Sequence, residues 1–308
     1  MLLEVKNLKT HFEIGGGGLF GRRRFHPAVD GVDLTLQAGE TLAIVGESGS
    51  GKSTLARSIL RLIPPTSGEV YFHGKNLGAL PQAEMRKARQ KMQMIFQDPY
   101  ASLNPRMTVL DLVAEPLDVH LSPSRAERET TVVEMLSRVG LSSEMRHRYP
   151  HEFSGGQRQR IGIARAMILH PDLVVADEPV SALDVSIQAQ VLALLSDLQA
   201  AFRLAYLFIS HDLSLVRRFA NRTAVMYRGR IVETAESRSL AAHPLHPYTQ
   251  RLQAAVPAAD PRQRGQSPAH PPFTPRCQHT ADAPFQLVEA QPAHFVACHI
   301  EDAPPDDD

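Results

Sequence analysis

The segment from residue 46 to residue 54 has the residue types of a loop that holds phosphate. It lies between an apolar run and a segment with helical spacing, a context that disfavours a Gly/Ser linker matching by chance. Glycine permits the backbone angles with which N–H groups converge on an anion, and the helix behind directs its positive end there. Lys52 would reach the β- and γ-phosphates, and the Ser53 hydroxyl would ligate Mg²⁺. The candidate phosphate-binding residues are Gly46, Glu47, Ser48, Gly49, Ser50, Gly51, Lys52, Ser53 and Thr54.

Two carboxylates follow a second apolar run and are suited to hydrolysis of a bound polyphosphate. Asp177 ends the run Leu173–Ala176, where it would hold Mg²⁺ through a water, and Glu178 would orient and deprotonate the attacking water. His211 follows the apolar segment 204–209 and would contact the γ-phosphate, because ligands of open α/β sheets bind at the carboxyl ends of strands.

Two further side chains are candidates at the same site. Gln97 ends another apolar run and would offer its amide oxygen to Mg²⁺ or to water. Phe12 follows a strand pattern and would stack on adenine, although a Phe in this position is more often a core residue.

A second anion-binding helix end is predicted at residues 153–157. Ser154 is a good N-cap for a helix over 157–169, and the two glycines leave the first N–H groups uncovered. Taken alone, the motif is an ordinary helix cap. Beside the phosphate loop it favours a head-to-tail pair, in which Ser154 of one subunit contacts the γ-phosphate held by Lys52 of the other. The candidate residues of this motif are Ser154, Gly155, Gly156 and Gln157.

The elements that must position these residues are those of an α/β protein with a largely parallel sheet. Residues of about 100–155 read as a helical subdomain inserted into this core. Beyond Ala235 proline becomes frequent, and the end at 304–308 is expected to be disordered. Strands are expected at 2–14, 32–36, 41–45, 173–176 and 204–209, and helices at 53–63, 107–117, 126–139 and 157–169.

Composition indicates a protein of a reducing compartment that works without spans of its own. The 308 residues carry 33 basic and 33 acidic side chains, so there is no overall electrostatic case for nucleic acid. No stretch approaches the roughly 18 uncharged apolar residues of a membrane span, and the N-terminus does not read as a secretion signal. Two cysteines do not indicate a disulfide scaffold. At a membrane, other subunits would supply the spans.

Over residues 1–260 the set of motifs resembles the nucleotide-binding subunit of an ABC transporter. Walker A is 46–54, the signature is 153–157 with Phe153 where Leu is commoner, and Walker B is 173–178. The remaining motifs of the resemblance are the Q-loop Gln97, the D-loop Ser181, Ala182, Leu183 and Asp184, and the switch histidine His211.

The resemblance implies an α/β fold, a P-loop NTPase (RecA-like) core with an antiparallel β subdomain and the inserted helical subdomain. The ATPase domain would cover 1–235, and a peptide-permease-type C-terminal extension would cover 236–308. It also implies ATP hydrolysis with ATP and Mg²⁺ as cofactors. The Mg²⁺ ligands would be Ser53, Gln97 and, through a water, Asp177.

Two stretches narrow the resemblance to the ATPases of oligopeptide/dipeptide and nickel importers. These are Phe96–Arg106 and His246-Pro247-Tyr248-Thr249, while the Gly/Arg insertion before Ala28 resembles the F-type subunit rather than the D-type. Such a chain would pair with a second ATPase subunit, of D-type, and drive two transmembrane permease subunits. An extracellular solute-binding protein would deliver the cargo, and the chain would lie on the cytoplasmic face of the plasma membrane. Peptide is the favoured cargo; nickel, glutathione or another small solute stays open.

The cysteines depart from the family pattern. Members often carry four in this extension, which can hold an iron–sulfur cluster, whereas this chain has Cys277 and Cys298 with Pro271 and Pro284 near the other two places. A four-cysteine cluster is therefore excluded within one chain. The alternatives are a metal-free remnant or zinc. The zinc ligands would be Cys277, His279, Cys298 and His299.

Two competing functions keep the fold and drop transport. Soluble ABC proteins that act on DNA ends or ribosomes usually need a long coiled-coil insert or two cassettes in one chain, and this sequence has neither, nor a basic stripe. A regulatory binding module is disfavoured by the intact Glu178. Co-purification with membrane subunits separates the importer from both.

Overall fold

The computed structural model describes residues 1–14, 24–254 and 286–297. The strands are β1 (Leu3–Glu13), β2 (Phe25–Leu36), β3 (Thr41–Val45), β4 (Ser67–Phe72), β5 (Lys75–Asn76), β6 (Met92–Ile95), β7 (Leu173–Asp177), β8 (Ala205–Ser210), β9 (Arg222–Tyr227), β10 (Arg230–Glu236), β11 (Leu287–Gln291) and β12 (His294–Ala297). The helices are α1 (Lys52–Ile59), α2 (Gln82–Lys91), α3 (Pro99–Ser102), α4 (Val109–His120), α5 (Arg125–Arg138), α6 (Gly155–Met167), α7 (Val185–Phe202), α8 (Leu213–Phe219), α9 (Ser237–Ala242) and α10 (Pro247–Ala254). Short 3-10 turns are η1 (Leu77–Ala79), η2 (Ser143–His147) and η3 (Pro150–Glu152).

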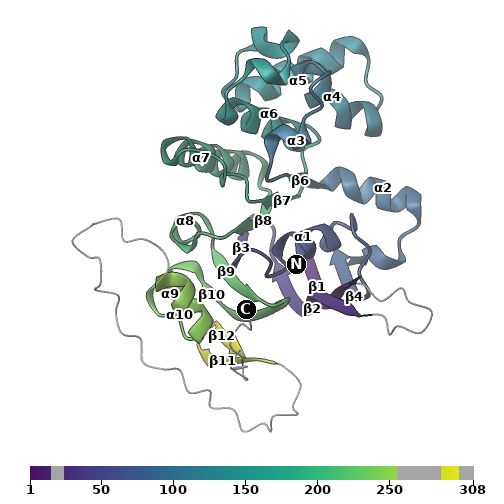
Figure 1. Cartoon of the computed structure of the whole chain (residues 1–308). Coiled ribbons are helices and arrows are strands. Elements are labelled where there is room, and N and C mark those ends of the chain that lie inside the picture. The colour runs from purple at the N-terminus through teal and green to yellow at the C-terminus, as the bar shows by residue number, and fades with distance from the viewer. Residues whose placement is uncertain (15–23, 255–285, 298–308) are drawn as a thin grey trace.

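Two sheets form the core of the molecule (Figure 1). The larger sheet has the order β11-β12-β10-β9-β3-β8-β7-β6, and its strands from β9 to β6 are parallel. The smaller sheet, β2-β1-β4-β5, is antiparallel. The predicted α/β core with an antiparallel β subdomain is confirmed.

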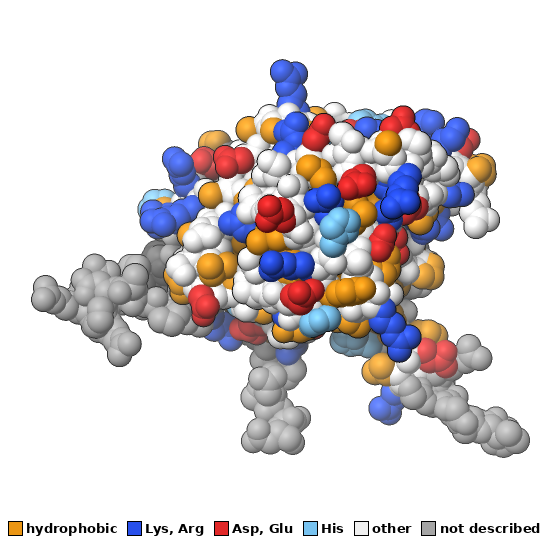
Figure 2. All heavy atoms as spheres, turned by 90° about the horizontal axis from the view of Figure 1, so that it is seen from above, with side chains coloured by type: hydrophobic (Ala, Val, Ile, Leu, Met, Phe, Trp, Pro, Cys, Tyr) orange, Lys and Arg blue, Asp and Glu red, His pale blue; other side chains and the backbone are white. Residues whose placement is uncertain are grey.

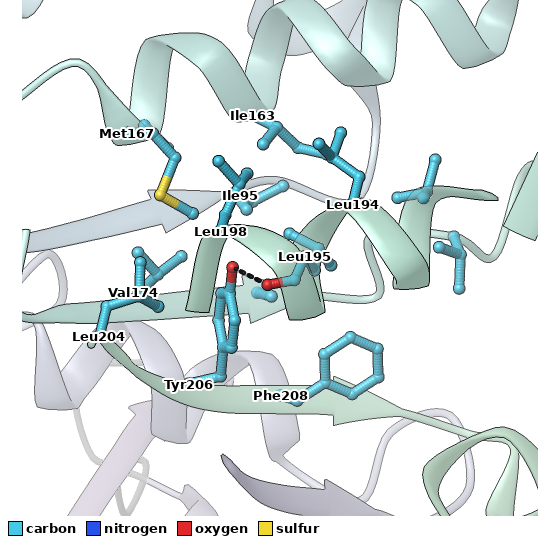
Figure 3. Packing of buried hydrophobic residues seen from close by; sticks show 14 of the residues in the cluster. Ile95, Ile163, Met167, Val174, Leu194, Leu195, Leu198, Leu204, Tyr206 and Phe208 are labelled. Atoms are coloured by element: carbon cyan, nitrogen blue, oxygen red, sulfur yellow. Dashed lines mark hydrogen bonds between the residues drawn. The ribbon is translucent and has the colours of Figure 1, made fainter. Parts of the chain in front are cut away.

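The parallel strands are buried on both faces, as their continuous apolar sequences require. Along β3, Ala43 and Val45 enter one hydrophobic cluster, while Leu42 and Ile44 enter the other. This alternation follows from the two-residue period of a strand. Figure 3 shows the first cluster, where side chains of α6 and α7 cover Tyr206 and Phe208 of β8.

Helices α4, α5 and α6 lie together at the top of Figure 1; α4 and α5 fall within the segment 100–155 predicted as a helical subdomain, and α6 begins where that segment ends. In the segment 126–139, where a helix was predicted, Val132, Leu136 and Val139 are all 0% exposed. The start of α5 is fixed by a capping box between Ser124 and Glu127. Figure 2 looks onto this end of the molecule and shows basic and acidic side chains interspersed, with hydrophobic ones between them.

The packing of α5 gives a stability prediction. Leu136→Ala removes a fully buried side chain and should lower the free energy of unfolding by about 2–5 kcal/mol, because a cavity adds to the lost burial. Leu121, at the end of α4, is 59% exposed. Leu121→Ala is therefore the control and should change the free energy of unfolding by less than about 0.5 kcal/mol. Urea unfolding measures both, and equal effects would contradict the burial of α5.

Helix α1 ends earlier than the predicted limit of residue 63. Arg61 takes a left-handed backbone angle, φ 52°, and the N–H groups of Leu62 and Ile63 turn back to the carbonyl of Arg57. This turn ends the helix at Ile59, so the proline pair that follows is not what stops it. Leu62, inside the predicted helix limits, consequently lies beyond the helix and is 50% exposed.

Helix α7 bears on the expectation that no stretch approaches roughly 18 uncharged apolar residues, and its Asp197 and polar residues keep it short of that composition. It is the one helix of the described residues that is long and apolar enough to cross a membrane, with a mean hydropathy of 1.2. Its Val191, Leu194, Leu195 and Leu198 are buried and belong to the core cluster (Figure 3). These four leucine and valine side chains therefore form the face of α7 that packs into the core.

Residues beyond 235 return to the same sheet. Strand β12 pairs with β10, with Glu233 opposite Val296 and Thr234 opposite Phe295, and β11 pairs with β12. The sequence patterns did not indicate this hairpin. The predicted tail at 304–308, the glycine insertion at 15–18 and both cysteines lie outside the described residues.

Candidate active site

The loop between β3 and α1 has the shape that its glycines require. Gly49 and Gly51 have positive φ values of 83° and 105°, which side chains rarely adopt. Gly46 is needed for a different reason: a Cβ at this position would lie 2.2 Å from the carbonyl oxygen of Met226. The first glycine therefore provides room for β9, while the other two provide backbone freedom.

Lys52 is buried under this loop. Its Nζ donates hydrogen bonds to the carbonyl oxygens of Gly46 and Glu47, both at 2.7 Å. Burial lowers the pKa of the Lys52 ammonium, while the nearby carboxylates of Glu178, Asp177 and Glu47 oppose that shift. The loop thus holds a cation at its centre, as a site for polyphosphate needs.

Ser53 and Asp177 meet across the gap between α1 and β7. The Ser53 hydroxyl donates to Oδ1 of Asp177 at 2.9 Å, and Asp177 is 1% exposed. Burial raises the pKa of the Asp177 carboxyl, although Ser53, Arg57 and Lys52 counteract it. A hydroxyl and a carboxylate side by side are the hard oxygen donors that suit Mg²⁺, so these residues fit that ion.

Two other predicted residues, Gln97 and His211, meet at the carboxylate of Glu178. Its Oε2 accepts a hydrogen bond from Nε2 of Gln97 at 3.0 Å and lies 3.4 Å from Nδ1 of His211. The backbone of Glu178 has a positive φ of 45°, and its N–H bonds to the carbonyl of Ile209 at 3.1 Å. Such a strained conformation is common at functional sites. Here it turns the carboxylate away from the strand and toward Gln97 and His211.

Lys52, Ser53 and the loop glycines Gly49 and Gly51 border a hollow of about 330 Å³. Phe12 lines it and is 39% exposed, and Glu178 and Gln97 lie at its edge. Sequence reasoning missed two lining residues, His26 and Ala28 of β2. No motif marks them, and only the pairing of β2 with β1, which sets His26 opposite Phe12, could have found them.

The signature residues are not brought to this hollow within one chain. Ser154 caps α6 with a capping box: Ser154 N–H donates to Oε1 of Gln157 at 3.0 Å, and Gln157 N–H donates to the Ser154 hydroxyl at 3.4 Å. None of residues 154–157 lines the hollow. Gly156 packs closely on α7, because a Cβ there would lie 2.7 Å from Cγ2 of Ile187.

The D-loop residues occupy the neighbouring surface. Ser181 borders a smaller hollow together with Glu178 and His211, whereas Asp184 is exposed at the N-cap position of α7 and makes no side-chain capping hydrogen bond. The next residue, Val185, is 81% exposed, which is high for a large apolar side chain. Next to the catalytic candidates the molecule therefore presents an uncovered face.

Sequence reasoning also missed the role of Tyr248. The backbone N–H of Glu47, expected among the phosphate-binding donors, instead donates to the Tyr248 hydroxyl at 2.8 Å. In the sequence, the motif His246–Thr249 indicated the family but not this contact. The two partners, Glu47 and Tyr248, are 201 residues apart in the chain.

In the described residues, no group of three or more His, Cys, Asp and Glu side chains is arranged to hold a metal ion. The zinc candidates Cys277, His279, Cys298 and His299 lie outside these residues.

Comparisons with known proteins agree with this geometry. Residues 29–181 match the family described as ABC transporter, and residues 232–283 match the oligopeptide/dipeptide transporter C-terminal region. The oligopeptide transport ATP-binding protein AppF of Bacillus subtilis is 49% identical over 97% of both chains. OppF of the same organism is 50% identical over 96% of both chains.

Solved structures of the same class are also similar. A dimeric structure of MJ0796, a bacterial ABC transporter cassette, has a TM-score of 0.69 and 30% identity over 77% of this chain and 99% of that one. A second dimeric structure of that cassette, in a post-hydrolysis state bound to ADP and Pi, is equally similar. The chain therefore belongs to the ATP-hydrolysing, ATP-binding subunits of ABC transporters, among those with the oligopeptide/dipeptide transporter C-terminal region.

Proposed function

We propose that this chain hydrolyses ATP with Mg²⁺ to power the import of di- and oligopeptides. The observation that carries the proposal is the convergence of Gln97 and His211 on Glu178, beside the contact between Ser53 and Asp177. Glu178 takes the proton of the attacking water, and His211 contacts the γ-phosphate.

The remaining site residues divide between nucleotide and metal. Lys52 and the amides of residues 48–54 bind the phosphates, and Phe12 stacks on adenine. Ser53 and Gln97 ligate Mg²⁺ directly, and Asp177 ligates it through a water. The hydroxyl, amide and carboxylate oxygens of these side chains support that assignment.

A second ATPase subunit completes the site. The placement of residues 154–157 away from the hollow supports a head-to-tail pair, in which Ser154 contacts the partner's ATP. Ser181 and Asp184 lie on the uncovered face and contact the partner there. Both similar structures of the cassette MJ0796, including the one bound to ADP and Pi, are described as dimeric, which agrees with this arrangement. By its F-type features the chain pairs with an unlike, D-type subunit.

Two transmembrane permease subunits are the other partners, and the chain lies on the cytoplasmic face of the membrane. A hollow of about 680 Å³ between the core and the helical subdomain supports this. Gln97 borders it, and so do the partly exposed apolar side chains of Phe96 and Val119. A segment of a membrane subunit seated there would transmit the motion of Gln97. An extracellular solute-binding protein delivers the cargo.

Peptide is proposed as the cargo because the curated relatives are named oligopeptide transport proteins and residues 232–283 match the corresponding C-terminal region. Nickel or glutathione is the second candidate class.

We also propose the division into an ATPase domain over 1–235, with its helical subdomain at 100–155, and an extension over 236–308. The extension holds no four-cysteine iron–sulfur cluster, since the sequence has two cysteines.

The test begins with co-purification of the tagged chain with membrane subunits from its own cells, followed by uptake assays with labelled dipeptide, Ni²⁺ and glutathione. We expect recovery of the membrane subunits and ATP-dependent dipeptide uptake that a Lys52→Ala chain does not support. Recovery without membrane subunits would contradict the transporter. Uptake of Ni²⁺ or glutathione alone would replace the peptide. Iron and zinc analysis of the same preparation tests the extension.

A further inference from the structure

The hydroxyl of Tyr248, in the C-terminal region, contacts the phosphate-binding loop. Tyr248 lies in α10, is 2% exposed, and its oxygen accepts the N–H of Glu47 at 2.8 Å. Its ring packs on Tyr227 at the end of β9, with centroids 4.3 Å apart. Burial raises the pKa of the Tyr248 phenol, so the neutral hydroxyl is the form that accepts this hydrogen bond near pH 7.

The peptide unit that Tyr248 holds is also the one that holds Lys52. The carbonyl of Gly46 and the N–H of Glu47 belong to a single planar peptide group. Its oxygen accepts from Nζ of Lys52 at 2.7 Å, and its N–H donates to Tyr248 at 2.8 Å. The next carbonyl, that of Glu47, accepts a second bond from Lys52 and one from the N–H of Ser50 at 3.2 Å. A rotation of this peptide plane would therefore displace the lysine and the loop together.

Tyr248 is itself fixed by a buried polar network. Its N–H donates to Nδ1 of His246 at 3.1 Å. The carboxylate of Glu233, on β10 and 0% exposed, accepts from the N–H groups of Leu245 at 2.7 Å and His246 at 3.1 Å. Nε2 of His294 on β12 lies 2.7 Å from the same carboxylate. Buried networks whose members are mutually bonded hold one geometry, so the start of α10 has little freedom.

We propose that Tyr248 is a positioning residue for ATP binding. Through its hydroxyl it holds the Gly46–Glu47 peptide group, and thereby Lys52, in the orientation that receives the phosphates. The inference rests on the proposed function of the loop and adds to it that the C-terminal region takes part in nucleotide affinity.

The test is Tyr248→Phe in the full-length chain, which keeps the ring and removes only the hydroxyl. Without its acceptor the Glu47 N–H is left unpaired, and the loop loses one constraint. We expect the Kd for ATP and the KM for ATP to rise about three- to tenfold, while kcat changes by less than twofold, because a net hydrogen bond contributes on that scale.

Tyr206→Phe is the matched control. Tyr206 is 0% exposed, and its hydroxyl donates to the carbonyl of Leu195 on α7 at 3.1 Å (Figure 3), so its hydrogen bond does not involve the phosphate-binding loop. This control should lower thermal stability and leave the Kd for ATP unchanged. A Tyr248→Phe chain that behaves in the same way, losing stability with unchanged Kd and KM, would overturn the proposal.

A second measurement does not depend on the variant folding. In the wild-type chain the amide of Glu47 should exchange its hydrogen slowly, at the rate of the hydrogen-bonded amides of α1, and a freely exchanging amide would also overturn the proposal. A wild-type chain that does not bind ATP would refute the proposed function instead. The two failures are therefore distinguishable.

Discussion

Replacing Glu178 by glutamine will abolish ATP turnover and leave ATP binding intact. Glutamine has the size of glutamate and can still meet Gln97 and His211, the two side chains that lie 3.0 and 3.4 Å from the carboxylate. It cannot take a proton from water. Loss of a positioned general base lowers the rate by roughly 10²–10⁴-fold. Phosphate release measures kcat, and equilibrium binding measures the Kd for ATP.

Affinity survives in this variant because other groups bind the phosphates. Lys52 is held by the carbonyls of Gly46 and Glu47, and the replacement leaves both of these hydrogen bonds in place. Glu84→Gln is the matched control: Glu84 lies on α2, has a 52% exposed side chain, and forms an ion pair with Lys75 at 3.8 Å. It should turn over ATP at the wild-type rate. Turnover of the Glu178→Gln chain within tenfold of wild type would assign the base elsewhere.

The candidate site could be predicted because it follows from strand order. Its polar residues come after β3, β8, β7 and β6, four parallel strands that are neighbours in the sheet. Parallel strands end at one edge, so the loop at 46–54, His211, Glu178 and Gln97 meet there whatever the details of packing. Short-range sequence patterns are sufficient to place each residue at a strand end, and the rule for parallel sheets brings them together.

Contacts that depend on distant parts of the chain could not be predicted in this way. The N–H of Glu47 pairs with Tyr248, and Glu233 pairs with His294, although 201 and 61 residues separate the partners. A buried carboxylate inside an apolar strand gives no local signal of its partner. The same holds for the β11–β12 hairpin, whose short sequence alternates too weakly to show that it extends the central sheet.

Local sterics explain a finer point that composition left open. Three glycines of one loop read alike in the sequence, yet Gly46 is required for space near Met226, Gly49 for its backbone angle alone, and Gly51 for both reasons. A Cβ on Gly51 would lie 2.0 Å from the carbonyl oxygen of Ala28, a backbone atom that cannot rotate away. The three positions should therefore tolerate substitution to different degrees.

Gly51→Ala should raise the Kd for ATP at least about a hundredfold, because the loop or β2 must move to relieve the contact with Ala28 and the backbone is strained besides. Gly39→Ala is the control for strain alone. Gly39 has a comparable positive φ of 74°, and nothing lies within 4 Å of its added Cβ.

The control should lose about 1–2 kcal/mol of stability, as a left-handed alanine does, and bind ATP with wild-type affinity. Isothermal titration and thermal unfolding separate the two effects. If Gly51→Ala lowers the stability only as much as Gly39→Ala does and binds ATP with wild-type affinity, the loop can adjust to the added methyl group. Close packing against β2 then does not set the shape of the loop. If Gly51→Ala instead weakens ATP binding far more than Gly39→Ala does, nucleotide affinity depends on the contact between Gly51 and Ala28, where the loop meets the antiparallel sheet.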